Sequence, residues 1–209
     1  MIKSSKYSLH LAKHIADNME GHTFHHHFHI LWDIRNQMDK EVVNYLEIGT
    51  FFGASLSLMM MSDKKTNIVG VDVGGDKIEV IEHNAVNFGY DHNNFKFVVG
   101  DSKKLETVQI VKGVMDNVDI LYIDGDHSYY GVIEDFLNYK DLVNPGGYIV
   151  FDDYNDWKYC PTVKHGVDYL VKNMLLDEFE IIGCVKNHVN ATPKSMVDSN
   201  EFIIRKKFN

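Results

Sequence analysis

The chain has 209 residues, 44% of them hydrophobic and 24% charged, which is typical of one globular domain with a sizeable buried core. Its formal net charge is −9, from 21 Lys and Arg against 30 Asp and Glu. Neutralisation of phosphate drives most binding to nucleic acids and to anionic lipid surfaces. An acidic chain without a basic run is therefore expected to bind neither.

The sequence shows no targeting pattern. The first residues lack an apolar signal-peptide core, and no apolar run approaches the ~18 residues that a membrane span needs. Its two cysteines, Cys160 and Cys184, fit neither a zinc knuckle nor a C-x-x-C redox motif and are interpreted as buried free thiols. These features predict a cytoplasmic protein with no membrane insertion.

In chain order, residues 2–38 predict helices interrupted near Gly21, and apolar β-branched runs then alternate with helical stretches. The expected strands are 42–48, 67–72, 95–99, 118–124, 147–152, 179–184 and 201–205. The expected helices between them are 54–62, 77–88, 104–115, 129–142 and 161–176. This alternation predicts an α/β fold with a seven-stranded, mostly parallel sheet and helices on both faces. The last two strands, joined by the polar loop 186–200, predict a hairpin with an antiparallel final strand.

The loop after the first strand carries the spacing E-x-G-x-x-x-G, from Glu47 through Gly49 to Gly53. Glycine lets a backbone approach a ligand closely, and the helix that follows offers free N–H groups. Neither the G-x-G-x-x-G dinucleotide pattern nor a Walker A loop is present. The spacing resembles motif I of the class I S-adenosylmethionine-dependent methyltransferases, which have a Rossmann-like fold. The resemblance implies that Glu47, Gly49, Thr50, Gly53 and Ser55 bind this cofactor.

Acidic residues close five successive predicted strands. They are Glu47, Asp72, Asp101, Asp124 with Asp126, and Asp152 with Asp153. Ligands of parallel sheets bind at the carboxyl ends of the strands. Some of these residues could be simple helix caps. Acidic residues clustered at five strand ends, however, repel one another unless a cation or a polar ligand occupies the space.

Two of these strand ends correspond to cofactor-binding positions of the class I methyltransferases that the glycine loop resembles. The resemblance implies that Asp72 accepts the hydroxyls of the cofactor ribose, and that Asp101 with Ser102 holds the adenine amino group. Each site has a simpler alternative, since Asp72 could cap the helix after Gly75 and Asp101 the helix from Lys104.

The strand ends at Asp124 and at Asp152-Asp153 are expected to be neighbours in space. Three carboxylates form an all-oxygen site, which suits Mg2+, Mn2+ or Ca2+ and not zinc. The run from "IDGDHSY" through "PGG" to "DD" resembles the metal-dependent O-methyltransferases that act on sugars, of the macrocin, mycinamicin and aminocoumarin-sugar types and their small stand-alone relatives. The similarity covers most of residues 45–154. It implies that Asp124, Asp152 and Asp153 hold the cation, with Asp124 also beside the cofactor.

Transfer of a methyl group to a hydroxyl also requires a base. Asp126, two residues beyond Asp124, is the first candidate, as the family's residue at that position implies. His127 is the second candidate, because the pKa of a free histidine is about 6.5. Alternatively, His127 only orients Asp126 or a backbone carbonyl.

The His-rich segment 22–29 has four interpretations: a transition-metal site, an acceptor-binding lid, a set of polar helix positions, or an oligomer contact. His25 and His29 have the i, i+4 spacing of helical metal ligands, but no third ligand is evident. Because the N-terminal segment covers the active site in related small methyltransferases, we expect residues 1–40 to form a helical extension or lid on a methyltransferase domain of residues 41–209. His25, His26 and His29 are then candidates for acceptor contacts.

Two aromatic residues after the Asp pair, Tyr154 and Trp157, could stack on a sugar ring or could anchor their loop to the core. The expected acceptor is a sugar or glycan, with a deoxyhexose such as rhamnose suggested by the family. Two alternative functions stay open: a metal-dependent methyltransferase with a catechol or phenolic acceptor, and a non-catalytic cofactor-binding module. The chain is also a candidate homodimer. Small modules of this kind also occur fused to glycosyltransferases. The chain is much shorter than the macrolide enzymes, so their acceptor-recognition regions cannot be transferred.

Overall fold

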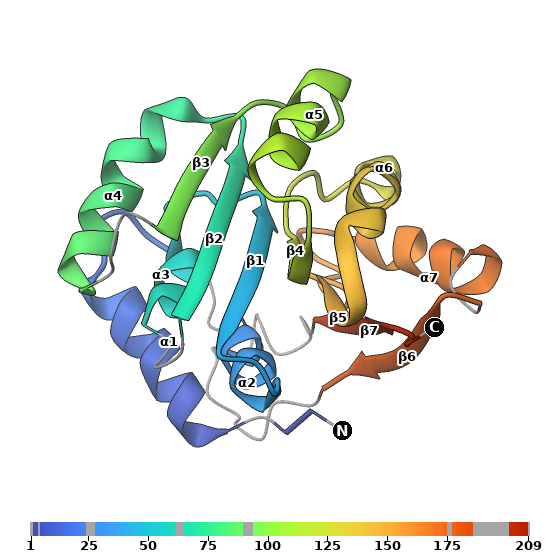
Figure 1. Cartoon of the computed structure of the whole chain (residues 1–209), viewed down its shortest axis with the longest axis horizontal. Helices are drawn as coiled ribbons and strands as arrows, with labels where there is room; N and C mark the ends of the chain where they lie inside the picture. Colours follow the sequence, from blue (N-terminus) through green and yellow to red (C-terminus); the bar gives the residue numbers. More distant parts are fainter. Residues whose placement is uncertain are drawn as a thin grey trace.

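The structure, a computed structural model, describes residues 2–3, 5–23, 28–61, 65–89, 94–174, 177–185 and 201–208. These residues form one seven-stranded sheet of order β3-β2-β1-β4-β5-β7-β6 (Figure 1). The strands are β1 (Val42–Ile48), β2 (Lys65–Asp72), β3 (Phe95–Val99), β4 (Val118–Ile123), β5 (Val143–Phe151), β6 (Phe179–Cys184) and β7 (Phe202–Lys206). β1 to β5 pair in parallel, and β7 runs antiparallel between β5 and β6. The predicted fold is therefore confirmed.

Helices cover both faces of this sheet, and each face has its own apolar core. The helices on one face are α1 (Lys6–Asn18), α2 (His29–Gln37), α3 (Ala54–Met60) and α4 (Ile78–Asn87). Those on the other face are α5 (Leu105–Val114), α6 (Tyr129–Tyr139) and α7 (Val163–Asn173). No helix among the described residues is long and apolar enough to cross a membrane.

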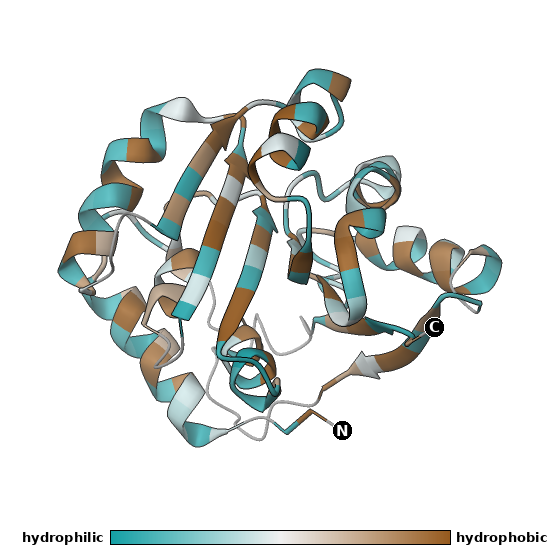
Figure 2. Ribbon diagram, viewed as in Figure 1, coloured by the Kyte–Doolittle hydropathy of each residue, from teal (hydrophilic) through white to brown (hydrophobic). Residues whose placement is uncertain are grey.

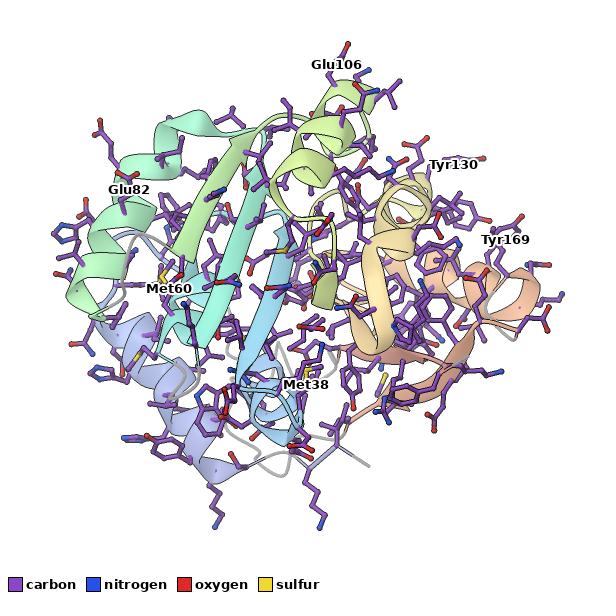
Figure 3. The ribbon with its side chains drawn as sticks, in the orientation of Figure 1. Met38, Met60, Glu82, Glu106, Tyr130 and Tyr169 are labelled. Carbon is purple, nitrogen blue, oxygen red and sulfur yellow. The ribbon has the colours of Figure 1, made fainter. Side chains whose placement is uncertain are left out.

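The side chains of each strand are shared between the two cores, because successive side chains of a strand point to opposite faces of the sheet. In β1, Tyr45 joins the core beneath α1 to α3, whereas Leu46 and Ile48 join the core beneath α5 to α7. Hydrophobic residues, drawn in brown, accordingly concentrate on the strands, and each helix carries both hydrophobic and hydrophilic residues (Figure 2). Glu82 of α4 and Glu106 of α5 point away from the sheet, as expected for the solvent side of an amphipathic helix (Figure 3).

The bounds of several elements differ from the expected ones. β5 begins at Val143 instead of residue 147, because Val143 pairs with Val118 and a register shift before Ile120 accommodates the Pro-Gly-Gly run. β2 begins at Lys65, and α7 ends at Asn173. α6 ends at Tyr139 and continues as the 3-10 helix η3 (Lys140–Leu142). The predicted loop 186–200 lies outside the described residues.

The N-terminal helices are part of the core. Arg35 of α2 is fully buried, and its Nε atom donates to Thr66 Oγ1 at 3.2 Å. The Ser8 hydroxyl of α1 donates to Asp33 Oδ2 of α2 at 2.6 Å. Buried polar groups with fixed partners determine the position of a helix more strictly than apolar contacts do. α1 and α2 are therefore anchored against each other, and α2 also against β2.

Candidate active site at the carboxyl ends of the strands

The loop between β1 and α3 approaches the end of β4 very closely. Gly49 has φ +84°, and a Cβ atom there would lie 2.1 Å from the carbonyl oxygen of Asp124. Its N–H donates to Val71 O of β2 at 2.8 Å. Gly53, with φ +79°, immediately precedes α3. Both glycines of the motif therefore occupy left-handed conformations, and Gly49 also has no room for a side chain.

Glu47 lies beneath this loop and has no exposed surface. Its carboxyl group accepts hydrogen bonds from Tyr45 Oη at 2.5 Å and Ser55 Oγ at 2.6 Å. Burial raises the pKa of Glu47 to about 8. The two hydrogen bonds lower this pKa, whereas the charges of Asp152 and Asp72 raise it. The resemblance implies that Glu47 binds the cofactor, and this stays a prediction. In the structure its carboxyl group is held by Tyr45 of β1 and Ser55 of α3.

This elevated pKa predicts a pH-dependent stability. The folded pKa of about 8 exceeds the ordinary value of 4.5, so the stabilising contribution is complete below about pH 4.5 and is lost as pH rises toward 8. We expect urea titrations to show the free energy of unfolding of wild type falling relative to Glu47→Gln between these limits, by up to about 1.4 kcal/mol per pH unit. Parallel curves for the two proteins would contradict the buried, neutral Glu47.

A first cavity of about 200 Å³ opens at the ends of β1, β2 and β3. Its lining includes Gly49, Asp72, Asp101, Lys103 and Asp126. Asp72 Oδ2 accepts the N–H groups of Thr50 at 3.0 Å and Phe51 at 2.9 Å, while its Oδ1 accepts that of Gly74 at 2.7 Å. The carboxylate that was predicted to bind ribose thus lies in the cavity and also fixes the glycine loop.

Lys103 is a residue of this cavity that the sequence did not predict. Its Nζ atom lies 3.1 Å from Asp126 Oδ2 and 3.4 Å from Asp101 Oδ1. Asp101 does not cap α5, since its carboxylate accepts the N–H of Lys103 at 3.0 Å and α5 begins at Leu105. The Ser102 hydroxyl donates to buried Asp135 at 2.6 Å, so it is used within the fold.

Four groups meet at the ends of β4 and β5. Ligand atoms of Asp124, His127, Asp152 and Asp153 all lie within 4.8 Å of one another. Burial raises the pKa of Asp124 well above its usual range, and the neighbouring charges of Asp152 and Asp153 raise it further. Such mutual repulsion is relieved by a cation, and three carboxylates with one imidazole fit a divalent ion.

His127 lies inside this cluster. Its Nε2 atom is 2.9 Å from Asp124 Oδ1, and its Nδ1 atom is 3.7 Å from Asp153 Oδ2. Burial alone would lower the pKa of His127, but Cys160 and the charges of Asp152 and Asp153 raise it to about 9. Cys160 was predicted only as a buried thiol, and its position against His127 is a second feature that the sequence did not show.

Asp126 lies on the other side of the same loop. Its carboxylate accepts the N–H of Ser128 at 3.0 Å and the Lys103 ammonium at 3.1 Å. Although partial burial opposes them, these hydrogen bonds lower the pKa of Asp126. The structure therefore places the first candidate base beside the first cavity, and the second candidate, His127, among the clustered carboxylates.

A second cavity, of about 70 Å³, connects the glycine loop with the N-terminal segment. Its lining includes Thr23, Phe28, Ser55, Tyr122 and Asp124. Thr23 and Phe28 of the His-rich segment thus line the same cavity as Asp124 of the carboxylate cluster. His25 and His26 themselves lie outside the described residues.

Two candidate acceptor contacts are engaged within the fold. His29 is only 1% exposed at the start of α2, because it packs into the core beneath that helix. Tyr154 donates to Asp168 Oδ1 of α7 at 2.6 Å, and its ring lies 4.6 Å from that of Phe202. This favours the loop-anchor interpretation of Tyr154. Trp157 is 54% exposed and remains accessible to a ligand.

Comparison with known proteins identifies the class that this fold and site define. Residues 46–154, more than half of the chain, match the family described as a methyltransferase domain. The chain therefore belongs to this family and is an S-adenosylmethionine-dependent methyltransferase. It is 40% identical over 206 residues to the uncharacterised protein R132 of Acanthamoeba polyphaga mimivirus, with 93% of each chain covered.

Two solved structures show the same fold. Cofactor-bound Rv0187 from MTB has a TM-score of 0.68 at 15% identity, over 97% of this chain and 90% of its own. The methyltransferase MycE of the mycinamycin biosynthetic pathway has a TM-score of 0.64 at 20% identity, over 96% of this chain and 53% of its own. At these identities the likeness concerns the fold alone.

Proposed function

We propose that this methyltransferase transfers the methyl group of S-adenosylmethionine to a hydroxyl of a sugar, with the help of a divalent cation, Mg2+ or Mn2+. The observation that carries the proposal is the cluster of Asp124, His127, Asp152 and Asp153 at the ends of β4 and β5, of which Asp124 lines the second cavity. The fold neighbour MycE, solved with Mg, S-adenosylhomocysteine and mycinamycin VI, supports it.

The first cavity supplies the binding site for the nucleoside part of the cofactor. Glycine at position 49 allows the loop to close on the ligand, and Asp72 offers carboxylate oxygens to the ribose hydroxyls. Lys103 holds Asp101 and Asp126 at the opposite wall. The methyl donor can then lie near Asp124, which lines the second cavity.

The acceptor hydroxyl is expected to enter the second cavity, between the N-terminal segment and Asp124. When bound by Asp124, Asp152 and Asp153, a divalent cation lowers the pKa of a hydroxyl and fixes its position. His127 is the group that removes the proton, because its imidazole lies among the clustered carboxylates and its side chain is 38% exposed. The proton can thus pass from the cluster to solvent.

The test is calorimetry with S-adenosylhomocysteine, repeated with Mg2+, with Mn2+ and with a chelator, followed by methyl-transfer assays. We expect cofactor binding, a separate cation isotherm, and chelator-sensitive methylation of free or glycosidic deoxyhexoses. Catechol tested in parallel separates the sugar acceptor from a phenolic one. Binding of the cofactor without any cation response would refute the cation, and turnover of catechol alone would refute the sugar.

A further inference from the structure

Cys160 lies in a corner of the site that the proposed methyl transfer does not use. Its Sγ atom is 3.2 Å from His127 Nδ1, and its thiol donates to Asp153 Oδ2 at 3.0 Å. The remaining separation, from Nδ1 to Oδ2, is 3.7 Å. One sulfur, one nitrogen and one oxygen from three different chain segments therefore face one another.

We propose that Cys160, His127 and Asp153 form a binding site for a thiophilic metal ion such as Zn2+. Zinc takes tetrahedral sets of Cys, His and Asp ligands, at about 2.3 Å from sulfur and about 2.0–2.2 Å from nitrogen or oxygen. Those lengths separate two ligand atoms of a tetrahedron by about 3.3–3.6 Å. The three observed separations bracket this range, so small side-chain movements would complete the coordination.

The orientation of His127 fits this role. Its Nε2 atom points to Asp124 Oδ1 at 2.9 Å, and a hydrogen bond there directs Nδ1 toward Cys160 and Asp153. Metal-binding histidines characteristically donate their other ring N–H to a carboxylate in this way. Asp153 and Cys160 are buried, whereas His127 is partly exposed, so water can reach the fourth position from the His127 side.

This site differs from the oxygen site in its chemistry. A thiolate selects zinc or cadmium over Mg2+, which prefers carboxylates and water. Because Asp153 belongs to both sets, the two ions exclude each other. If the proposed methyl transfer is correct, zinc would inhibit it by holding both Asp153 and His127. The binding of zinc itself does not depend on that function.

The experiment titrates the purified chain with Cd2+ and follows the ultraviolet thiolate-to-cadmium charge-transfer band, which histidine and carboxylate sites do not produce. One equivalent is expected to saturate the wild type, and Zn2+ should abolish the band by competition. Cys184→Ser is the matched control, because Cys184 lies at the end of β6 and belongs to neither group of potential metal ligands found among the described residues. It should keep the band.

Cys160→Ser should lose the band. Loss of an outer hydrogen-bond partner costs a metal site about 10–100-fold in affinity, so loss of the thiolate should weaken Zn2+ by about 100-fold or more. As a measurement independent of any variant, X-ray absorption of the zinc-loaded wild type should show one sulfur at about 2.3 Å. No band in wild type, a band that follows Cys184 instead, or a zinc spectrum without sulfur would overturn the proposal. None of these readouts requires an acceptor or turnover.

Discussion

His127→Asn is expected to lower kcat by about 10²- to 10⁴-fold, the usual contribution of a positioned general base. Asp126→Asn should act differently, changing mainly the KM for S-adenosylmethionine. The two residues are adjacent in sequence, but only His127 joins the carboxylate cluster. Asp126 pairs with Lys103 at the wall of the first cavity, and its lowered pKa makes it a weaker proton acceptor.

The measurement is a pH profile of kcat and KM for both variants and for wild type, with S-adenosylhomocysteine binding as the check on folding. A base must be unprotonated, so wild-type kcat should fall as the pH drops below the pKa of His127. That pKa is about 9 when no cation is present, and a bound positive charge shifts the fall to lower pH. His127→Asn should lose this dependence. A collapse of kcat in Asp126→Asn, with His127→Asn active, would restore Asp126 as the base.

Asp126 and His127 show which features of the site a sequence pattern can predict and which it cannot. Apolar runs that alternate with helical stretches predict the sheet, because burial of both faces of a strand leaves little choice of register. The strand ends follow, because parallel strands deliver their carboxyl ends to one edge. The side of a loop that a residue faces cannot be predicted in this way. Asp126 and His127 share that loop, and only the partners they meet, Lys103 and Asp153, separate them.

Long-range contacts explain the residues that the sequence did not predict. Lys103 and Cys160 join the site from loops 23 and 33 residues away from their partners Asp126 and His127. No local periodicity records such a distance. Tyr154 shows the same limitation, since an aromatic residue after two aspartates suggests a sugar platform, and only the position of Asp168 on α7 reveals its bonding partner.

Gly49→Ala is expected to abolish binding of S-adenosylhomocysteine and to destabilise the fold. A left-handed conformation costs an L-residue about 1–2 kcal/mol. In addition, the new methyl group would lie 2.1 Å from the carbonyl oxygen of Asp124, so the ends of β1 and β4 must move apart. Overpacking of this kind costs about 1–3 kcal/mol more. Urea unfolding should therefore show a loss of about 2–5 kcal/mol.

Gly89→Ala separates these two effects. Gly89 also has a positive φ, +75°, but a Cβ atom there meets nothing within 4 Å. This variant should lose only the ~1–2 kcal/mol of stability that a left-handed conformation costs an L-residue. It should bind S-adenosylhomocysteine as wild type does. If Gly49→Ala matched it in both stability and binding, the close approach to Asp124 would be unnecessary. The expected difference instead ties the cofactor loop to the carboxylate cluster, because the atom that excludes a side chain at position 49 belongs to Asp124 itself.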